Sequence, residues 1–171
     1  MGTHLSNYGG KPPTLAKALG MTTHEAEAFQ KRWFAMHPGI KTWHLEVENS
    51  LMTTRSVRNR FGFRRFYFDR IQGLLPQALA WIPQSTIAIV INHGLIKISE
   101  SNTSMELLLQ VHDSLVGQFP ESDQYINLPI LQHCLATTVP YPDPFIIGTS
   151  LDLSSKSWGD RISLNWADIH N

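Results

Sequence analysis

The sequence predicts an α+β fold, in which helices fill the first fifty residues and antiparallel strands come later. Apolar residues recur at helical spacing from Ala26 to Phe34, which is typical of an amphipathic helix. Residues 55–68 and 105–119 instead carry runs of branched or aromatic side chains, which favour strands. Hydrophobic residues make up 42% of the 171. That share is enough for the core of one domain.

Three helices are expected before residue 53. The second begins at a cap formed by Thr22 or Thr23, with Glu25 in its first turn where the helix dipole favours an acidic side chain. Gly20 ends the first helix, and a His-Pro-Gly sequence ends the second. The expected ranges are 14–19, 22–37 and 40–52.

The remaining elements alternate strands with two further helices. Turn residues and apolar runs predict a hairpin over 55–68 that breaks at Gly62, a helix over 74–98 in which Pro83 is a candidate kink, and strands over 105–111 and 115–119. A helix over 123–135 and a single strand over 145–153 should follow. Trp158 and Trp166 are the expected anchors of the C-terminal tail.

Charge is distributed unevenly along the chain. The formal net charge is zero, which taken alone argues against a nucleic-acid partner. Residues 1–70, however, hold eleven Lys/Arg and five Asp/Glu, for +6, whereas residues 71–171 hold three and nine, for −6. This polarity indicates an anion bound on one side and a cation on the other.

Compartment and membrane signals are few. The one cysteine, Cys134, cannot form an internal disulfide, so a reducing, cytoplasmic location is expected. Pro83 and three polar residues interrupt the most apolar stretch, which predicts no membrane span, and the N-terminus has no signal-peptide pattern.

His112, Asp113 and Ser114 separate two strand-like runs, 105–111 and 115–119. Asp113 should therefore project from the tip of a hairpin, where a carboxylate can hold Mg²⁺. The alternative is an aspartate that only satisfies the amides of the turn.

Arginine is concentrated in residues 55–70, where one aspartate opposes six arginines. The arginine fork suits phosphate oxygens, so this hairpin is a candidate nucleic-acid contact, with one cationic and one apolar face. A solvated charged surface is the alternative.

Gln84 lies in an apolar helix and is expected to be buried unless it reaches a ligand such as the DNA minor groove. A structural hydrogen bond explains it nearly as well. The candidate DNA-binding residues are Arg58, Arg60, Arg64, Arg65 and Gln84.

Several short motifs resemble landmarks of the family A (DNA polymerase I-like) DNA polymerases, and they occur along the chain in the family's order. His4-x-x-x-Tyr8-Gly9 is similar to the end of motif B, and Gln110-Val111-His112-Asp113 to motif C. The other matches are His37-Pro38-Gly39 to a helix break, 60–66 to the Gly-Arg-Arg hairpin, 78–86 to the helix whose Gln faces the primer–template, and 148–160 to the C-terminal strand and Trp turn. The Gln-Ser-Thr and Asn-Tyr-Gly variants look most like phage members.

This resemblance implies part of a polymerase palm, an antiparallel sheet with the motif C hairpin, and the C-terminal fingers helices. Residues 1–52 would be the end of the fingers and 53–171 the palm portion. It also implies catalytic roles for Asp113 and His112, with Asp113 as the metal ligand for Mg²⁺, and a nucleotide-binding role for His4, Tyr8 and Gly9. The implied partners are primer–template DNA, dNTP and an upstream polymerase part that carries motif A and the motif B lysine.

Without that upstream part the chain should be inactive, since two-metal phosphoryl transfer needs carboxylates from two places. Ser114 stands where the family usually has a second acidic residue, and Pro76-Gln77 stand where many relatives have an arginine. The rival interpretation is a non-catalytic nucleic-acid-binding module. A His-Asp phosphohydrolase is disfavoured because His93 and His133 are poorly placed as further metal ligands.

Overall fold

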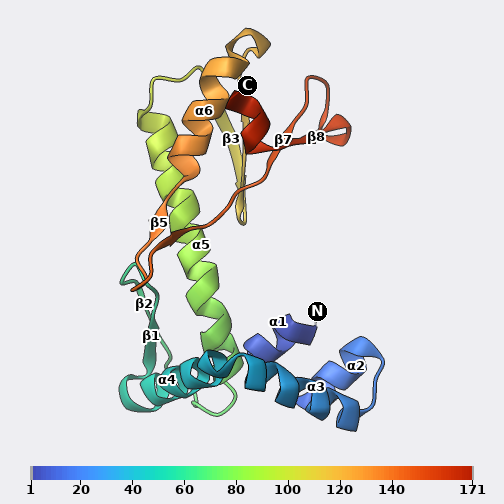
Figure 1. Cartoon of the computed structure of the whole chain (residues 1–171). Helices are drawn as coiled ribbons and strands as arrows, with labels where there is room; N and C mark the ends of the chain where they lie inside the picture. The colour runs from blue at the N-terminus through green and yellow to red at the C-terminus, as the bar shows by residue number, and fades with distance from the viewer. Residues whose placement is uncertain (1, 171) are drawn as a thin grey trace. The chain divides into compact units, whose positions relative to one another are not determined.

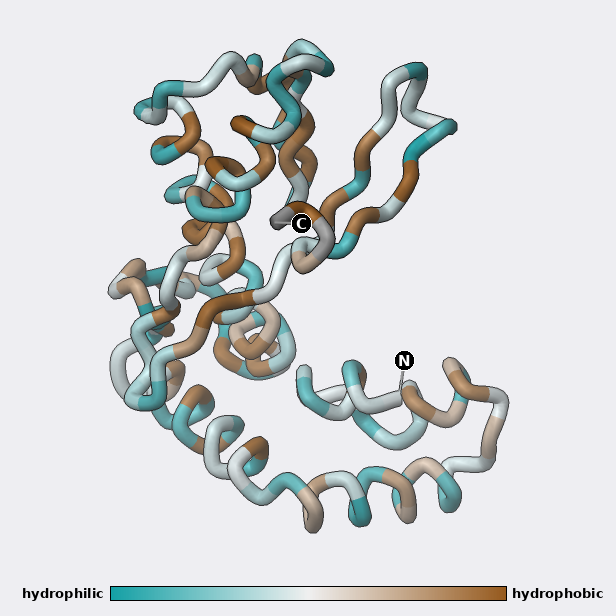
Figure 2. The backbone as a smooth tube through the Cα atoms, turned by 45° about the horizontal axis from the view of Figure 1, so that its top comes forward, coloured by the Kyte–Doolittle hydropathy of each residue, from teal (hydrophilic) through white to brown (hydrophobic). Residues whose placement is uncertain are grey.

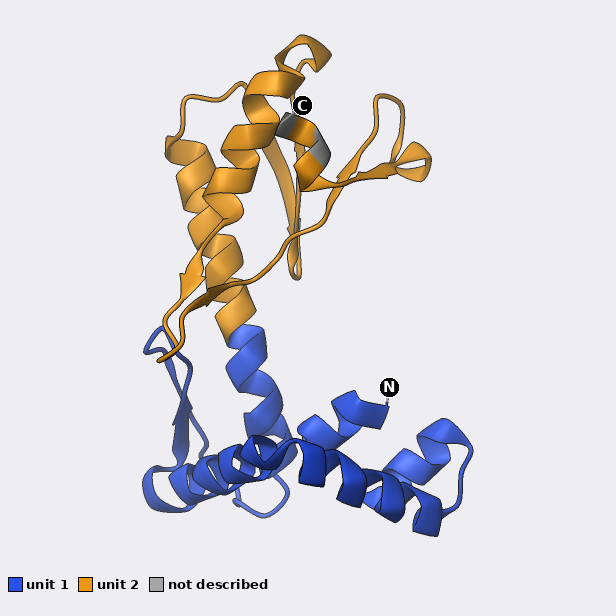
Figure 3. Cartoon of the chain, viewed as in Figure 1, with its two compact units in different colours: residues 1–85 blue, residues 86–171 orange. Residues whose placement is uncertain are grey.

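The computed structural model describes residues 2–170, which form two compact units, Met1–Ser85 and Thr86–Asn171 (Figure 3). The boundary falls inside one long helix, α5 (Leu75–Glu100) (Figure 1). The other elements of the first unit are α1 Gly2–Asn7, α2 Pro12–Leu19, α3 Thr23–Met36, α4 Pro38–Thr54, β1 Ser56–Arg58 and β2 Arg64–Phe66.

Local capping signals fix the ends of the N-terminal helices. The Thr22 side chain accepts a hydrogen bond from the Glu25 amide at 3.2 Å, and the Glu25 carboxylate accepts one from the Thr22 amide at 2.8 Å. The Thr22 amide and the Thr22 hydroxyl both donate to the Glu25 carboxylate and lower its pKa. The reciprocal bonds form a capping box. Gly20 ends α2 in the left-handed conformation, with φ 67°. The three expected helices are confirmed as α2, α3 and α4, and α1 precedes them as a fourth. Helices α2 and α4 begin earlier than expected, at Pro12 and Pro38, because proline suits the first helical turn.

Two apolar clusters hold the first unit together. One, contributed by α2 and α3, consists of Leu15, Ala16 and Ala26, with Leu5 of α1 packed against it. The other joins α4, the β1–β2 hairpin and the start of α5, and its buried members are Val47, Leu51, Val57, Tyr67, Ala78 and Leu79. Figure 2 shows hydrophobic and hydrophilic residues alternating along the helices near the N-terminus. This pattern is expected of helices that bury one stripe.

Tyr67 is a costly member of this core. Its hydroxyl is buried and has no hydrogen-bond partner among the described residues, and burial raises its pKa. Tyr67→Phe should therefore raise the free energy of unfolding by about 1–3 kcal/mol, the usual cost of an unsatisfied buried polar group. Urea unfolding measures this change. Tyr125→Phe is the control because Tyr125 is exposed; a Tyr67→Phe variant less stable than the parent would show that the hydroxyl has a partner.

The second unit combines α6 with short antiparallel ribbons. Strands β3–β4, β5–β6 and β7–β8 pair within neighbouring segments, as β1–β2 does in the first unit. Mixed helices and antiparallel strands confirm the α+β class. The elements are β3 Glu106–Val111, β4 Ser114–Gln118, η1 Glu121–Asp123, α6 Gln124–Leu135, β5 Thr138–Val139, β6 Phe145–Ile146, β7 Leu151–Leu153, η2 Trp158–Asp160, β8 Ile162–Leu164 and η3 Trp166–His170.

The prediction of one strand over 145–153 is wrong. Phe145–Ile146 pairs with Thr138–Val139, whereas Leu151–Leu153 pairs with Ile162–Leu164. Residues 147–150 join these two separate ribbons and belong to neither. Each half of the predicted strand therefore has its own hairpin partner.

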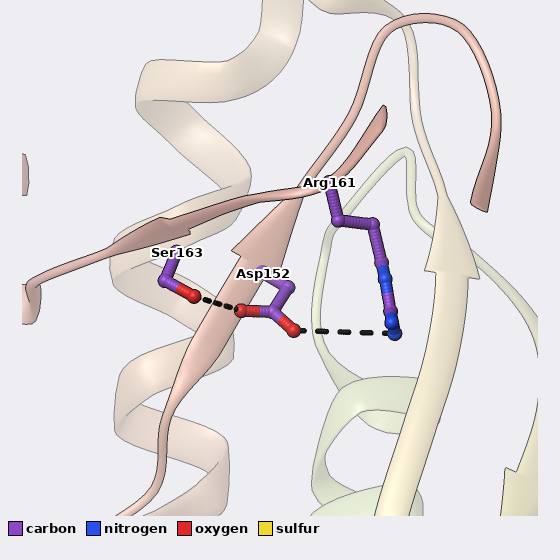
Figure 4. Close-up of polar contacts among 3 residues, drawn as sticks. All are labelled: Asp152, Arg161 and Ser163. Atoms are coloured by element: carbon purple, nitrogen blue, oxygen red, sulfur yellow. Dashed lines mark hydrogen bonds and ion pairs between the residues drawn. The ribbon is translucent and has the colours of Figure 1, made fainter. Parts of the chain in front are cut away.

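The C-terminal ribbon is joined by polar contacts across its strands. The Asp152 carboxylate accepts a hydrogen bond from Ser163 at 2.7 Å and lies 4.0 Å from the Arg161 guanidinium (Figure 4). Trp166 is an anchor, as expected, because its indole N–H donates to the Thr149 carbonyl at 2.7 Å. The expectation fails for Trp158, which is 61% exposed and whose ring lies beneath the Arg161 guanidinium, with 4.2 Å between them.

Helix α5 is long and apolar enough to cross a membrane, with a mean hydropathy of 1.3 over its most apolar window. One such helix is a weak indication, because the core helix of a soluble protein passes the same test. Within each unit, α5 contributes residues to the buried core, including Leu79 in the first and Ile98 in the second.

Candidate active site and nucleic-acid interface

The strands β3 and β4 form a hairpin whose tip consists of His112 and Asp113. Val111 pairs with Ser114, so the turn has two central residues and Ser114 belongs to the strand. His112 has φ 55°, while Asp113 keeps a negative φ. This sign pattern is that of a type II′ turn, which suits the twist of a hairpin. The expected tip is confirmed, but it is one residue shorter than the sequence indicated.

The Asp113 side chain is exposed at this tip. No hydrogen bond between groups that the structure describes ends on its carboxylate, so the turn does not use the side chain to satisfy its own amides. A free carboxylate is a suitable oxygen ligand for Mg²⁺. The described residues, however, contain no cluster of three or more His, Cys, Asp or Glu side chains. Asp113 therefore fits one ligand position, and the described residues do not build a complete metal site.

A polar network fixes the base of the same hairpin. Ser104, just before β3, donates to the Asp123 carboxylate at 2.6 Å, and the Asn127 amide donates to Ser104 at 2.9 Å. Hydrogen bonds from Ser104 and Ser122 lower the pKa of Asp123. The start of β3 is thereby held to the start of α6.

One side of the hairpin faces α5. The Gln110 amide donates to Asn92 of α5 at 3.5 Å. Leu109 and Val111 flank Gln110 and, because successive strand side chains alternate, point away from α5. Both are exposed, at 61% and 47%. The tip thus rises from a sheet with an uncovered apolar face.

His4 and Tyr8 lie together at the N-terminus, as their spacing predicts. Their rings meet edge to face with centroids 4.5 Å apart, and the Tyr8 amide donates to the His4 carbonyl. Gly9 follows with φ 72°, and a Cβ at that position would lie 3.3 Å from Leu79. Glycine therefore lets the chain leave α1 directly against the core.

Two side chains of α3, the buried Gln30 and the half-buried Trp33, hold the end of α1. The Gln30 amide donates to the Ser6 hydroxyl at 3.2 Å and to the Gly10 carbonyl at 2.8 Å. The Asn7 side chain accepts from Trp33 at 2.8 Å. Gln30 was not predicted as a functional residue, although its position in the stripe of Ala26 and Trp33 marks a polar group in the core.

The arginine hairpin divides its cations between both faces of the sheet. Arg58 pairs with Arg64, and Val57 pairs with Arg65. Since side chains of directly paired residues share a face, Arg58 and Arg64 lie on one side and Arg65 on the other. The expectation of one cationic and one apolar face is therefore wrong. Each arginine of β2 lies near an aromatic ring two residues on: Arg64 is 5.6 Å from Phe66, and Arg65 is 5.1 Å from Tyr67.

The arginines are not equivalent. Arg55 already bonds to the backbone that follows β2, because its guanidinium donates to the carbonyls of Tyr67, Phe68 and Asp69. The guanidinium groups of Arg58 and Arg64 belong to exposed residues. Arg60 is also exposed and lies in the loop between the strands.

Gln84 differs from the expectation of a buried polar residue. It is exposed on α5, and no hydrogen bond to another described residue ends on its side chain. The neighbouring Ser85 is the residue that makes structural contacts, with Asn59 and Ile82. Asn59 was not predicted as a site residue, and Ser85 entered only as part of the Gln-Ser-Thr motif. An asparagine between two arginines, two residues before Phe-Gly, was the available signal for a turn.

Comparison with known proteins places these motifs in a family. Residues 5–156 match DNA polymerase family A, a stretch that begins one residue after His4. Among curated relatives, the DNA polymerase of Mycobacterium phage L5 is 25% identical over 89% of this chain and 24% of its own length. The thermostable DNA polymerase I of Thermus filiformis is 33% identical over 67% of this chain and 15% of its own.

A solved structure shares the fold. It is the POL domain of Pol1 from M. smegmatis in complex with DNA primer-template and dNTP, with a TM-score of 0.71, 21% sequence identity, and coverage of 78% of this chain and 26% of that one. The chain thus spans about a quarter or less of the length of these relatives. The chain belongs to DNA polymerase family A.

Proposed function

We propose that this chain is the C-terminal palm and fingers part of a DNA-directed DNA polymerase, which transfers nucleotides to a primer 3′ end as the template directs. Residues 1–52 are the end of the fingers, and residues 53–171 are the palm portion. The observation that carries the proposal is the free carboxylate of Asp113 at the tip of the β3–β4 hairpin in a chain of family A.

Asp113 donates one oxygen ligand to Mg²⁺, which neutralises charge on the reacting phosphates when bound. The backbone supports this role, because a two-residue turn between paired strands presents the carboxylate clear of the sheet. His112 occupies the adjacent turn position and acts as a positioning residue near the primer terminus. The other carboxylates that bind the metal ions come from the upstream polymerase part.

The first unit binds the substrates. His4 and Tyr8 line the sugar and base of the incoming dNTP, and Gly9 lets that surface lie close to α5. Arg58, Arg60, Arg64 and Arg65 contact phosphates of the primer–template without reading its sequence. Exposed Gln84 reaches the minor groove, where an amide can pair with base-edge acceptors.

The upstream polymerase part covers the apolar face of the β3–β4 hairpin. Two strands with exposed Leu109 and Val111 are marginal by themselves, so further structure on this face stabilises the hairpin. The same packing brings a second set of carboxylates near Asp113. The reaction belongs in a cytoplasm that supplies dNTPs.

The 171-residue chain by itself should not extend a primer. One carboxylate cannot position two metal ions, so incorporation of a labelled nucleotide should stay at background in Mg²⁺. Primer extension by rigorously purified chain checks this, with the Asp113→Asn variant in parallel. Extension by the chain that disappears in Asp113→Asn would contradict the prediction.

The second candidate is a nucleic-acid-binding module without chemistry. The observation in its favour is that the described residues combine an exposed arginine hairpin with only one candidate metal carboxylate. The two candidate functions differ in what they expect of an Asp113 variant. Loss of the carboxylate impairs DNA synthesis if the chain is part of the enzyme, and has no such effect if the chain is a binding module.

A further inference from the structure

Asn59 lies between two arginines of the hairpin but is itself buried, with 4% of its surface exposed. Its side-chain oxygen accepts hydrogen bonds from the amides of Phe61 at 3.1 Å and Phe63 at 3.0 Å. The backbone N–H of Asn59 donates to the Phe63 carbonyl at 2.9 Å. One residue therefore closes the loop that joins β1 to β2.

The Asn59 carbonyl also accepts from the Gly62 amide within the loop, at 3.0 Å, whereas the side-chain amide bonds to α5. Its side-chain amide donates to the Ser85 hydroxyl at 3.0 Å. The Ser85 hydroxyl donates its own hydrogen bond to the Ile82 carbonyl at 3.1 Å, so its oxygen is oriented to accept from Asn59. Ser85 follows exposed Gln84 directly. The bond thus ties the loop of the arginine hairpin to the helical turn that carries Gln84.

We propose that Asn59 is a positioning residue that, through Ser85, holds the arginine hairpin and Gln84 in one fixed arrangement so that they engage the same DNA duplex. This inference rests on the proposed function, in which both elements contact primer–template DNA. It adds two residues whose side chains face the protein and not the DNA.

Fixed spacing matters because the two elements read different parts of a duplex. Arg58 and Arg64 meet phosphates, whereas Gln84 meets a base edge inside a groove. The strands of the hairpin have three residues each, and such a short ribbon is marginal without packing. Val57 packs the ribbon into the core with α4 and α5, and the bond from Asn59 to Ser85 in addition fixes the loop at its tip.

The test is a double-mutant cycle on duplex affinity in the full chain. Arg64→Ala and Gln84→Ala should be coupled, so that their combined loss departs from the product of the single losses by about fivefold. In a Ser85→Ala background the coupling should fall within about twofold of additivity, since the bond to Asn59 is gone.

Ser50→Ala is the matched control. Ser50 is also a half-buried helical serine whose hydroxyl tethers the hairpin, by donating to the Ser56 carbonyl at 2.8 Å, but among the described residues its hydroxyl bonds to neither the loop nor α5. The coupling should survive in that background. Amide hydrogen exchange gives a second readout that needs no DNA: Asn59→Ala should speed exchange at Phe61 and Phe63, and Ser85→Ala should leave both more protected than Asn59→Ala does.

The outcomes distinguish failure of the proposed DNA contacts from failure of the positioning role of Asn59 and Ser85. If neither Arg64→Ala nor Gln84→Ala weakens duplex binding, the proposed DNA contacts are wrong and the inference falls with them. If both weaken binding but their coupling is unchanged by Ser85→Ala, or is lost equally in Ser50→Ala, only the positioning role is overturned.

Discussion

Replacing Arg64 and Arg65 together with alanine should flatten the salt dependence of duplex binding. Each phosphate neutralised by a cation contributes about 0.9 to the slope of log affinity against log salt, so the slope should decrease by up to about 2. Arg64 is exposed and Arg65 half-buried, on opposite faces of β2. A decrease of the slope by about 1 would therefore mean that only one face of the hairpin contacts phosphate. Fluorescence anisotropy with a labelled duplex at several salt concentrations measures the slope.

Two controls separate phosphate contact from folding and from net charge. The Lys double variant keeps both charges and should retain most of the slope, although it loses the planar fork that stacks beside Phe66 and Tyr67. Lys31→Ala/Arg32→Ala removes two charges from α3 and should leave the slope unchanged. Equal slopes in the parent and in the Arg64/Arg65 alanine variant would make the hairpin a solvated charged surface.

Replacing Asp113 with asparagine should abolish DNA synthesis in a complex with the upstream polymerase part. The expected loss is about a thousandfold, or ~4 kcal/mol at 1.36 kcal/mol per factor of ten, because metal ions stabilise transition-state charge by several kcal/mol. Duplex binding should remain nearly intact, since the carboxylate acts on the ion and not on the DNA backbone. Single-turnover incorporation and duplex affinity are measured on the same preparation.

Neighbouring variants sharpen the test. Ser114→Ala should cost far less, because Ser114 is a strand residue beside the turn. His112→Ala should slow synthesis without eliminating it, as expected of a positioning residue. Asp143→Asn, an exposed loop aspartate, is the matched control and should be silent. If Asp113→Asn incorporates as fast as the parent complex, the metal role is wrong.

Local signals determined what could be predicted from the sequence. Thr22 with Glu25, and Gly20, set helix ends through contacts within a few residues, and the structure has the same ends. His112-Asp113 between two apolar runs likewise predicted its hairpin. In each case the interaction that decides the structure lies between near neighbours.

Pairing register and burial were not predictable in the same way. Residues 145–153 alternate like one strand, but their two halves bond to different segments. The faces of the arginine hairpin depend on Arg58 pairing with Arg64, a register that composition does not fix. Gln84 is exposed because α5 buries other positions at that turn, such as Thr86. Contacts distant in sequence decide all three.

The measurement that tests the central claim most directly is single-turnover nucleotide incorporation at saturating Mg²⁺, with and without this chain. The chain is mixed with the segment of a family A polymerase that carries motif A and the motif B lysine, and a primer–template and one dNTP are supplied. The proposal predicts template-directed incorporation only when both parts are present. No incorporation by the folded, assembled pair, or equal incorporation by the upstream segment alone, would contradict the claim that this chain is the palm and fingers part of the enzyme.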